Sequence, residues 1–413
     1  MHGNDIHECK SVRWWGYAVR VFLLGAGASK SYGNSPTGQR MPIARDFFQT
    51  FYKLKISENP WVLIEGLIGY LEREKKVHSA LEFLMSGVDI EAIHSEIEEY
   101  RDSRRGHVLE SYFSSRAYNE LVFLFSSVLN EIQNGPMSKP HLRLAEMILP
   151  TDAVITFNWD TLLDRALASK GLWRPDWGYV VRPNQLFRDG WKDPQTQVAF
   201  NAPKLIKLHG STNWITAYAI QDATTGELRL THDLDPASFN VFIEATRPYA
   251  CYAGRYMAGY EPYSYGYYPP NLNFSGLPAP EGRVIVRVRQ KSPWKREGEA
   301  DSEGLVSMPL IIPPVRNKTY DLFGGLFRTL WNEAEKILAE ADEVVVIGYS
   351  FPATDIQSDQ LFRRAFSRRQ TIPRVTVIDP MPLRPASKFR DDFGVREPNL
   401  VVRAEYFNEN TEI

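Results

Sequence analysis

Cysteine is scarce in this sequence of 413 residues, which contains Cys9 and Cys251 and no others. Two cysteines this far apart cannot build a disulfide framework or a four-cysteine zinc site, so we expect no metal and a reducing, cytoplasmic environment. An excess of charge of one sign is also lacking. The formal net charge of -2 gives no general attraction to nucleic acid or to an anionic membrane.

Long hydrophobic runs are missing as well. The uninterrupted apolar run near the N-terminus, Val21 to Leu24, is shorter than the roughly 7–15 residues of a signal-peptide core. No stretch approaches the ~20 apolar residues that span a membrane. We therefore expect a cytoplasmic protein without membrane contact, long enough for several domains or for one domain with insertions.

Short apolar runs occur at intervals and predict buried strands. They begin at residues 19, 153, 204, 344 and 375, with helical patterns at 160–169, 326–339 and 356–366. Strands that are apolar throughout and alternate with helices indicate a parallel sheet covered on both faces. The predicted fold class is α/β: a Rossmann-like parallel sheet with helices on both faces.

The region after the first strand has apolar residues spaced by three and four, as at Ile64, Leu67, Ile68 and Leu71. This spacing is typical of amphipathic helices, so we predict a large all-helical insertion here. The predicted organisation is an N-terminal tail over 1–18, a Rossmann domain over 19–44 and 151–413, the helical insertion over 45–150, and a second insertion over 217–305 within the Rossmann domain.

A glycine-rich turn directly follows the first predicted strand. Its residues are Gly25, Ala26, Gly27, Ala28 and Ser29. Glycine lets the backbone turn sharply and approach a pyrophosphate, whose charge is favoured by backbone N–H groups. Lys30 replaces the third glycine of the dinucleotide-binding fingerprint, so a tight turn without a ligand is the alternative.

Polar residues follow the second and third predicted strands, at the ends where open α/β sheets bind ligands. Asn158 offers both a donor and an acceptor, whereas Asp160 accepts from a ligand or caps the next helix. His209 precedes Gly210 at the end of the third strand. Its imidazole, with a pKa of ~6.5, accepts a proton in catalysis or makes a structural hydrogen bond.

The last two predicted strands end in the same way. Gly348 permits a close backbone approach, and Ser350 can bond a phosphate or a ribose hydroxyl. Asp379 can accept from a ribose diol. Turn and helix-cap roles are the alternatives for all three residues.

Together these motifs resemble the sirtuin family from Gly25 to Asp379: Gly-Ala-Gly-x-Ser, Thr-x-Asn-x-Asp, Leu-His-Gly and a late Gly-x-Ser occur in the same order and at strand ends. The resemblance implies that Asn158 lies beside the nicotinamide ribose, that Asp160 lies in the nicotinamide pocket, and that His209 is the catalytic histidine. The residues expected to bind the dinucleotide are Gly25, Ala26, Gly27, Ala28, Ser29, Asp160, Gly348, Ser350 and Asp379.

The sequence departs from protein-deacylating sirtuins in two respects. It lacks their four-cysteine zinc module, and Phe157 stands where they usually carry glutamine. With the helical insertion, these departures resemble the bacterial sirtuin-like proteins of antiviral defence, which hydrolyse NAD+. The resemblance implies NAD+ as substrate without a metal, and release of nicotinamide and ADP-ribose. Because this activity is toxic, we expect a homo-oligomer or a separately encoded partner, for example a ring-forming HerA-type ATPase.

Three alternatives stay open. The chain is a protein deacylase, a non-catalytic subunit that binds NAD or ADP-ribose, or a nucleic-acid-binding protein. The last rests on a basic run that includes Arg287, Arg289, Lys291, Lys295 and Arg296, although such a run is usually a solvated face. The tyrosine-rich stretch from Tyr249 to Tyr268 is compatible with a lid, a subunit contact or core packing.

Overall fold

The computed structural model describes residues 19–54, 61, 64–104, 107–133, 135–171, 173–187, 191–195, 201–217, 219–221, 228–230, 239–242, 288–289, 303–304, 307–312, 324–352 and 355–413. The predicted N-terminal tail and the tyrosine-rich stretch lie outside these residues. So does most of the basic run between residues 287 and 296.

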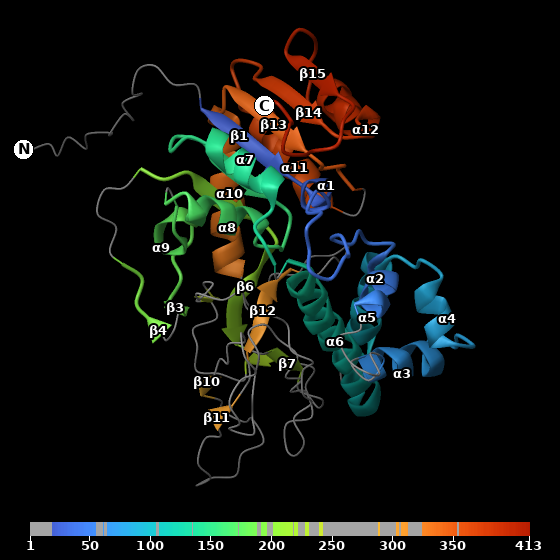
Figure 1. The fold of residues 1–413 in the computed structure, drawn as a ribbon. Helices are drawn as coiled ribbons and strands as arrows, with labels where there is room; N and C mark the ends of the chain where they lie inside the picture. The colour runs from blue at the N-terminus through green and yellow to red at the C-terminus, as the bar shows by residue number, and fades with distance from the viewer. Residues whose placement is uncertain are drawn as a thin grey trace, which may run out of the picture.

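A six-stranded parallel sheet forms the centre of the fold, in the order β15-β14-β13-β1-β2-β5 (Figure 1). Its strands are β1 (Arg20–Leu24), β2 (Ala153–Thr156), β5 (Lys204–Lys207), β13 (Glu343–Ile347), β14 (Arg374–Ile378) and β15 (Leu400–Arg403). The first five are the predicted strands, and their inner residues are buried, as expected for strands covered on both faces. The predicted α/β class is confirmed. The sixth strand, β15, was not predicted.

The order of the strands reverses between β1 and β13. From β1 the chain moves outward through β2 to β5, and from β13 it moves outward in the other direction to β15. Because parallel crossovers are right-handed, the helices of the two halves cover opposite faces. On one face α7 (Lys139–Met147) packs with α8 (Leu162–Ser169), and on the other α10 (Gly324–Glu340) packs with α11 (Ile356–Ser367). Past β14 the chain forms α12 (Leu383–Ser387) and a π-helical turn, Lys388–Asp392.

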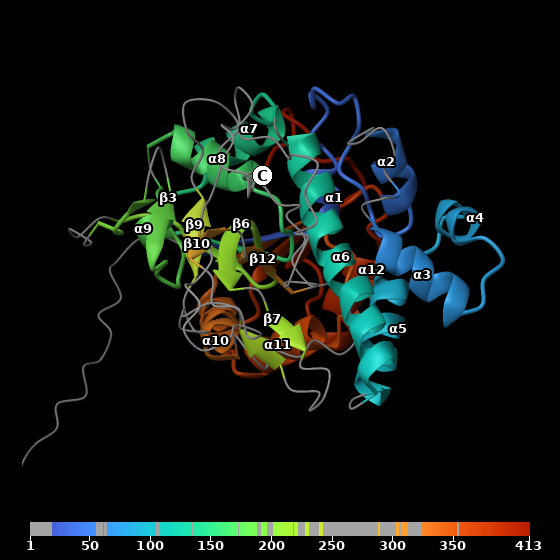
Figure 2. The ribbon, with the colours of Figure 1, turned by 90° about the horizontal axis from the view of Figure 1, so that it is seen from below.

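The elements described between β1 and β2 are all helices. They comprise α1 (Ala26–Ser29), α2 (Phe47–Lys53), α3 (Glu65–Arg73), α4 (Ala80–Met85), α5 (Ile90–Ser103), α6 (Val108–Gln133) and α7. Helices α2 to α6, which we call the helical unit, pack around a second hydrophobic cluster to one side of the sheet, which also includes Leu162 of α8 and Ile311 (Figures 1 and 2). In contrast, Leu144 and Ala145 of α7 belong to the core of the sheet. None of the described helices is both long and apolar enough to cross a membrane.

A second sheet of mixed direction lies beyond the carboxyl end of β5, in the order β12-β6-β9-β3-β4. Its strands are β3 (Gln185–Phe187), β4 (Trp191–Lys192), β6 (Gly210–Ala217), β9 (Asn240–Phe242) and β12 (Ser307–Ile311). The smaller elements nearby are α9 (Pro175–Gly178), β7 (Ala219–Gln221), β8 (Leu228–Leu230), β10 (Val288–Arg289) and β11 (Glu303–Gly304). Sequence patterns did not predict this sheet. It matters for function because β6 begins at the residue after His209 and pairs with β12.

Candidate active site

The carboxyl ends of neighbouring strands lie level with one another where the strand order reverses. The register pairs Leu24 of β1 with Thr156 of β2 and with Ile347 of β13, and β2 ends level with β5. Open α/β sheets bind ligands at this position. The loops that follow the four strands, at 25–29, 157–160, 208–211 and 348–350, thus meet at one edge of the sheet, which we call the site edge.

The glycine turn is packed directly against the loop after β13. Gly27 N–H donates to the Gly348 carbonyl oxygen over 2.9 Å, and Gly25 N–H donates to the Ile347 carbonyl oxygen over 3.0 Å. A Cβ atom on Gly25 would lie 2.5 Å from the Gly348 oxygen, and one on Gly348, whose φ is +62°, would lie 2.4 Å from the Ala28 nitrogen. These glycines are therefore required by backbone packing, whatever ligand the turn binds.

The Asn158 amide is oriented by two partners that are distant in sequence. Its Nδ2 atom donates to the Gly25 carbonyl oxygen and to the Ser29 hydroxyl, each over 2.8 Å. A carbonyl oxygen can only accept, so the amide nitrogen, and not the amide oxygen, must face Gly25. One hydrogen of the amide nitrogen is donated to Gly25 and the other to Ser29. Among the described residues no donor reaches Oδ1, so this oxygen is the atom that Asn158 presents to a ligand.

Asp160 lies one residue before the N-cap of α8, which is Thr161, although its side chain still binds a backbone N–H at the start of the helix. Its Oδ1 accepts from the backbone N–H of Leu162, the first residue of α8, over 3.0 Å. Its Oδ2 accepts from the Ser29 hydroxyl over 2.5 Å. Ser29 thus links Asp160 to Asn158, and substitution of one of these three residues disturbs the other two.

The His209 imidazole is surrounded by aromatic rings and faces a carboxylate. It is 4 % exposed, and its ring centroid lies 5.2 Å from that of Phe157, 5.8 Å from Trp159 and 6.2 Å from Trp331. Its Nε2 atom is 3.8 Å from Oδ2 of Asp355. Because Phe157 and Trp159 flank Asn158 in sequence, the structure places the two predicted catalytic residues in adjacent loops that contact each other.

Main-chain hydrogen bonds hold these loops together. Thr212 N–H donates to the Trp159 carbonyl oxygen over 2.8 Å, and Ile312 N–H donates to the His209 carbonyl oxygen over 2.8 Å. The Trp159 indole N–H donates back to the Ile312 carbonyl oxygen over 3.1 Å. The Trp159 ring also lies edge-on to Phe125 of α6, so the helical unit contacts the loop that carries Asn158.

The predicted residues after β13 and β14 lie farther from this centre. Ser350 is exposed, and Asp379 is half-buried. Oδ1 of Asp379 accepts from Met381 N–H over 2.7 Å, so its turn-capping role is present. Their roles in binding a dinucleotide stay predictions.

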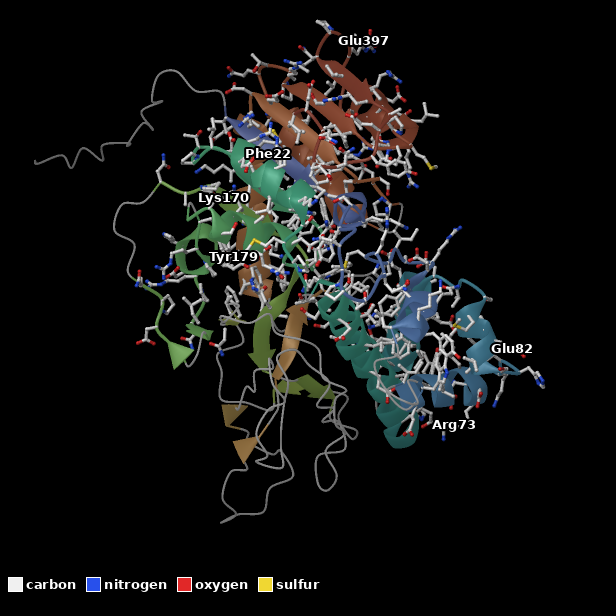
Figure 3. All side chains as sticks on the ribbon, viewed as in Figure 1. Phe22, Arg73, Glu82, Lys170, Tyr179 and Glu397 are labelled. Atoms are coloured by element: carbon white, nitrogen blue, oxygen red, sulfur yellow. The ribbon has the colours of Figure 1, made fainter. Side chains whose placement is uncertain are left out.

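A buried ionic network beneath the site edge was not predicted. Lys207 is 1 % exposed, and its Nζ donates to the Asp160 carbonyl oxygen over 2.5 Å and to Oδ2 of Asp164 over 3.1 Å. The Tyr179 hydroxyl donates to the other oxygen of Asp164 (Tyr179 is labelled in Figure 3). Burial, together with the Asp164 charge, raises the pKa of Tyr179 well above its usual value. The signal in the sequence was a lysine at the end of an otherwise apolar strand.

Two further neighbours of His209, Trp331 and Asp355, were also missed. Trp331 lies in the middle of α10, where its spacing indicates only core packing. Asp355 directly precedes α11 and follows the Gly-Tyr-Ser loop, so a polar residue at a strand end was visible in the sequence. The proximity of Asp355 to His209, which lies 146 residues earlier in the chain, depends on the order of the strands and could not be read from the sequence.

A second buried histidine lies behind the site edge. His141 of α7 is 1 % exposed, and its Nδ1 is 2.7 Å from the Ser138 hydroxyl oxygen. Burial lowers the pKa of His141 to about 4, although the Asp160 charge acts in the opposite direction. Among the described residues no group of three or more His, Cys, Asp or Glu side chains is placed to hold a metal ion.

No known family model matches the sequence, and no curated protein is significantly similar to it. Similarity to solved structures is found with sirtuins. A structure on the basis of sirtuin substrate affinity has 14% identity and a TM-score of 0.29, covering 94% of this chain and 88% of that chain. A Sir2 homologue with ADP-ribose has 15% identity and a TM-score of 0.28, covering 89% and 83%. A complex of Sir2 with a peptide and NAD+ has 14% identity and a TM-score of 0.29, covering 94% and 88%.

Likenesses with TM-scores this low carry no argument about this chain. The strand order and register of the chain itself define its fold. The order β5-β2-β1-β13-β14-β15 corresponds to 3-2-1-4-5-6, the strand order of a Rossmann fold.

Proposed function

We propose that this chain hydrolyses NAD+ to nicotinamide and ADP-ribose. The observation that carries the proposal is the Asn158 amide, oriented through its nitrogen so that Oδ1 is left for a ligand, on a loop whose Phe157 and Trp159 rings contact the buried His209 imidazole. An amide oxygen and an imidazole are the two groups that the reaction requires, one to hold a water molecule and one to accept a proton. The sirtuin-like order of the motifs supports the same conclusion.

The chemistry is within reach of these groups without a metal. The nicotinamide of NAD+ carries a positive charge and leaves as a neutral molecule, so its departure requires no general acid, unlike ordinary glycoside hydrolysis. Water held by Asn158 Oδ1 attacks the anomeric carbon as the bond to nicotinamide breaks, and His209 accepts the proton from that water. Water and NAD+ thus give nicotinamide, ADP-ribose and one proton.

The aromatic rings around His209 suit the charge of the reacting group. Phe157, Trp159 and Trp331 present ring surfaces near the imidazole, and ring faces attract cations more strongly where water is excluded. An oxocarbenium-like ribose is such a cation, so we assign these rings to stabilising it. The dinucleotide would extend past Ser29 and Gly27 toward Gly348, Ser350 and Asp379.

Release of nicotinamide from NAD+ by the purified chain tests the proposal. Wild type is expected to release nicotinamide, whereas Asn158→Ala and His209→Ala are expected to be inactive although folded. Asn410→Ala and His78→Ala are matched controls, because both residues are exposed and distant in sequence from the site loops. Full activity in both site variants would contradict the assignment. The assay is run at increasing protein concentration, because activity that depends on assembly appears only at high concentration.

We also propose that this activity depletes cellular NAD+ in antiphage defence, under the control of assembly or of a separately encoded partner such as a HerA-type ATPase. The support is the resemblance in motifs and the toxicity of an uncontrolled NAD+ hydrolase. Size measurement of the chain from its native host, with identification of co-purifying proteins, tests this control. Recovery of a fully active monomer alone would contradict it.

A further inference from the structure

The loop before α11 holds a buried carboxylate that the reaction described above does not use. Asp355 is 5 % exposed, and its Oδ2 atom lies 3.8 Å from Nε2 of His209. This separation is an ion-pair distance, longer than a hydrogen bond. Catalytic hydrogen bonds are often long in unliganded enzymes and shorten when the substrate binds.

We propose that Asp355 is the positioning residue of His209. Its carboxylate orients the imidazole and stabilises the imidazolium that forms when His209 accepts a proton. This inference rests on the proposed hydrolysis of NAD+. A carboxylate can only accept, so Nε2 carries a hydrogen when it faces Oδ2, and this selects the tautomer of the ring.

The carboxylate is itself held in place from several sides. The Tyr349 hydroxyl donates to Oδ2 over 3.0 Å, and Ser358 N–H donates to Oδ1 over 3.3 Å. The Ser358 hydroxyl donates to the Asp355 carbonyl oxygen over 2.9 Å and lies 2.7 Å from the Tyr349 oxygen. A carboxylate held at both oxygens, on a backbone that is itself hydrogen-bonded, keeps its position while the charge on a neighbouring ring changes.

Tyr349 also helps to position the His209 imidazole, through the ring of Phe157. Tyr349 stacks on Phe157 with a centroid distance of 4.3 Å and an interplanar angle of 9°, and Phe157 lies edge-on to His209. Tyr349 therefore contacts both the Asp355 carboxylate and the Phe157 ring that packs against the imidazole. Burial and the Asp355 charge raise the pKa of Tyr349 well above its usual value, so this hydroxyl stays a neutral donor.

Uncharged groups from three further elements also pack around His209. The loop after β2 contributes the rings of Phe157 and Trp159, α10 contributes the Trp331 ring, and the residue after β12 contributes a backbone N–H. The Glu91 carboxylate at the start of α5 acts on the Tyr349 hydroxyl. Asp355, whose Oδ2 lies 3.8 Å from Nε2, is thus a negative charge within ion-pair range of the imidazole, and it favours the protonated form of His209.

A purely structural role, the capping of α11, is the competing explanation. Asp355→Asn separates the two, because asparagine is as good an N-cap as aspartate and removes the charge. Its one oxygen accepts from Ser358 N–H, while its amide nitrogen donates to the Tyr349 oxygen, whose own hydrogen can turn to the Ser358 hydroxyl 2.7 Å away. We expect wild-type thermal stability, a fall in kcat for nicotinamide release of at least ~10-fold, and an unchanged KM. The acid limb of the kcat profile should move to lower pH by about one unit, because the neutral imidazole then persists in more acid solution.

Asp359→Asn is the matched control. Asp359 lies on the same helix and is bound to Arg363 and Lys388, away from His209, so neither kcat nor the pH profile should change. A wild-type kcat and pH profile in Asp355→Asn would overturn the inference.

A readout that does not require activity separates this inference from the proposed function. The His209 imidazole is titrated by NMR in wild type and in Asp355→Asn. A midpoint lower by about one pH unit in the variant supports the pairing even if wild type releases no nicotinamide. An unchanged midpoint overturns the pairing even if NAD+ hydrolysis is demonstrated.

Discussion

The two sides of the site edge are built differently. On the β1–β2–β5 side, Ser29, Asn158 and Asp160 form a continuous chain of hydrogen bonds, and His209 is enclosed by rings. On the β13–β14 side, Ser350 is exposed and Asp379 closes its own turn. Polar groups that are held by several protein partners are fixed before substrate arrives, as catalysis requires, whereas open polar groups are suited to binding. On the proposed function, we therefore expect the chemistry on the first side and mainly binding contacts on the second.

The largest effect is expected from Asn158→Asp. A carboxylate has no hydrogen to donate to the Gly25 carbonyl oxygen, so the side chain must leave the orientation that presents Oδ1. We expect nicotinamide release to fall at least ~100-fold in initial-rate measurements. Asn410→Asp, an exposed substitution of the same type, serves as the control. Near-normal turnover in Asn158→Asp would remove the distinction between the two sides.

Gly348→Ala tests the place where the two sides pack against each other. The added Cβ meets the Ala28 nitrogen at 2.4 Å, and the φ of +62° adds strain, so we expect a loss of about 3 kcal/mol of unfolding free energy in urea titrations. Gly171→Ala is the matched control, with a φ of +70° and no atom within 4 Å of the added Cβ. Equal losses in the two variants would show that strain alone, and not the close approach, is responsible.

The histidine behind the β1–β2–β5 side makes stability depend on pH. Burial lowers the pKa of His141 to about 4, so below about pH 6.5 the unfolded chain binds a proton that the folded chain does not. Unfolding free energy should therefore fall as pH decreases from about 6.5 to 4, by up to ~1.4 kcal/mol per pH unit for this group. His141→Phe, which keeps a ring against Phe407, should reduce this slope, as measured by urea unfolding at pH 7, 5.5 and 4.5. An unaltered slope would assign the acid sensitivity to other groups.

The smallest effects are expected on the β13–β14 side. Ser350→Ala and Asp379→Asn each weaken one predicted contact with NAD+, so we expect KM for NAD+ to rise by roughly 2–5-fold with kcat nearly unchanged. Steady-state kinetics over a range of NAD+ concentrations measures both constants. A fall in kcat comparable with that of Asn158→Asp would mean that both sides take part in the chemistry.

Most of the central sheet was predictable, because its strands are short apolar runs with loops of small and polar residues behind them. The exception is β15 at the edge of the sheet, where Leu400 is buried and the other three residues are partly or fully exposed. The second sheet was missed because its strands are short, and pairs such as β6 with β12 join segments about a hundred residues apart. In the site, Asn158, Asp160 and His209 were found by their positions at strand ends, whereas Asp355 and Trp331 were not.

The sequence by itself determined which segments become buried strands and which polar residues follow them, because apolar runs and strand-end residues act over a few neighbouring positions. The tertiary structure alone decided which of these residues meet. The orientation of Asn158 depends on Gly25 and Ser29, 133 and 129 residues away, and the pairing of His209 with Asp355 depends on the strand order. Hydrogen-bond and ion-pair partners are set by the register and order of strands, which bring distant segments within a few ångströms of each other.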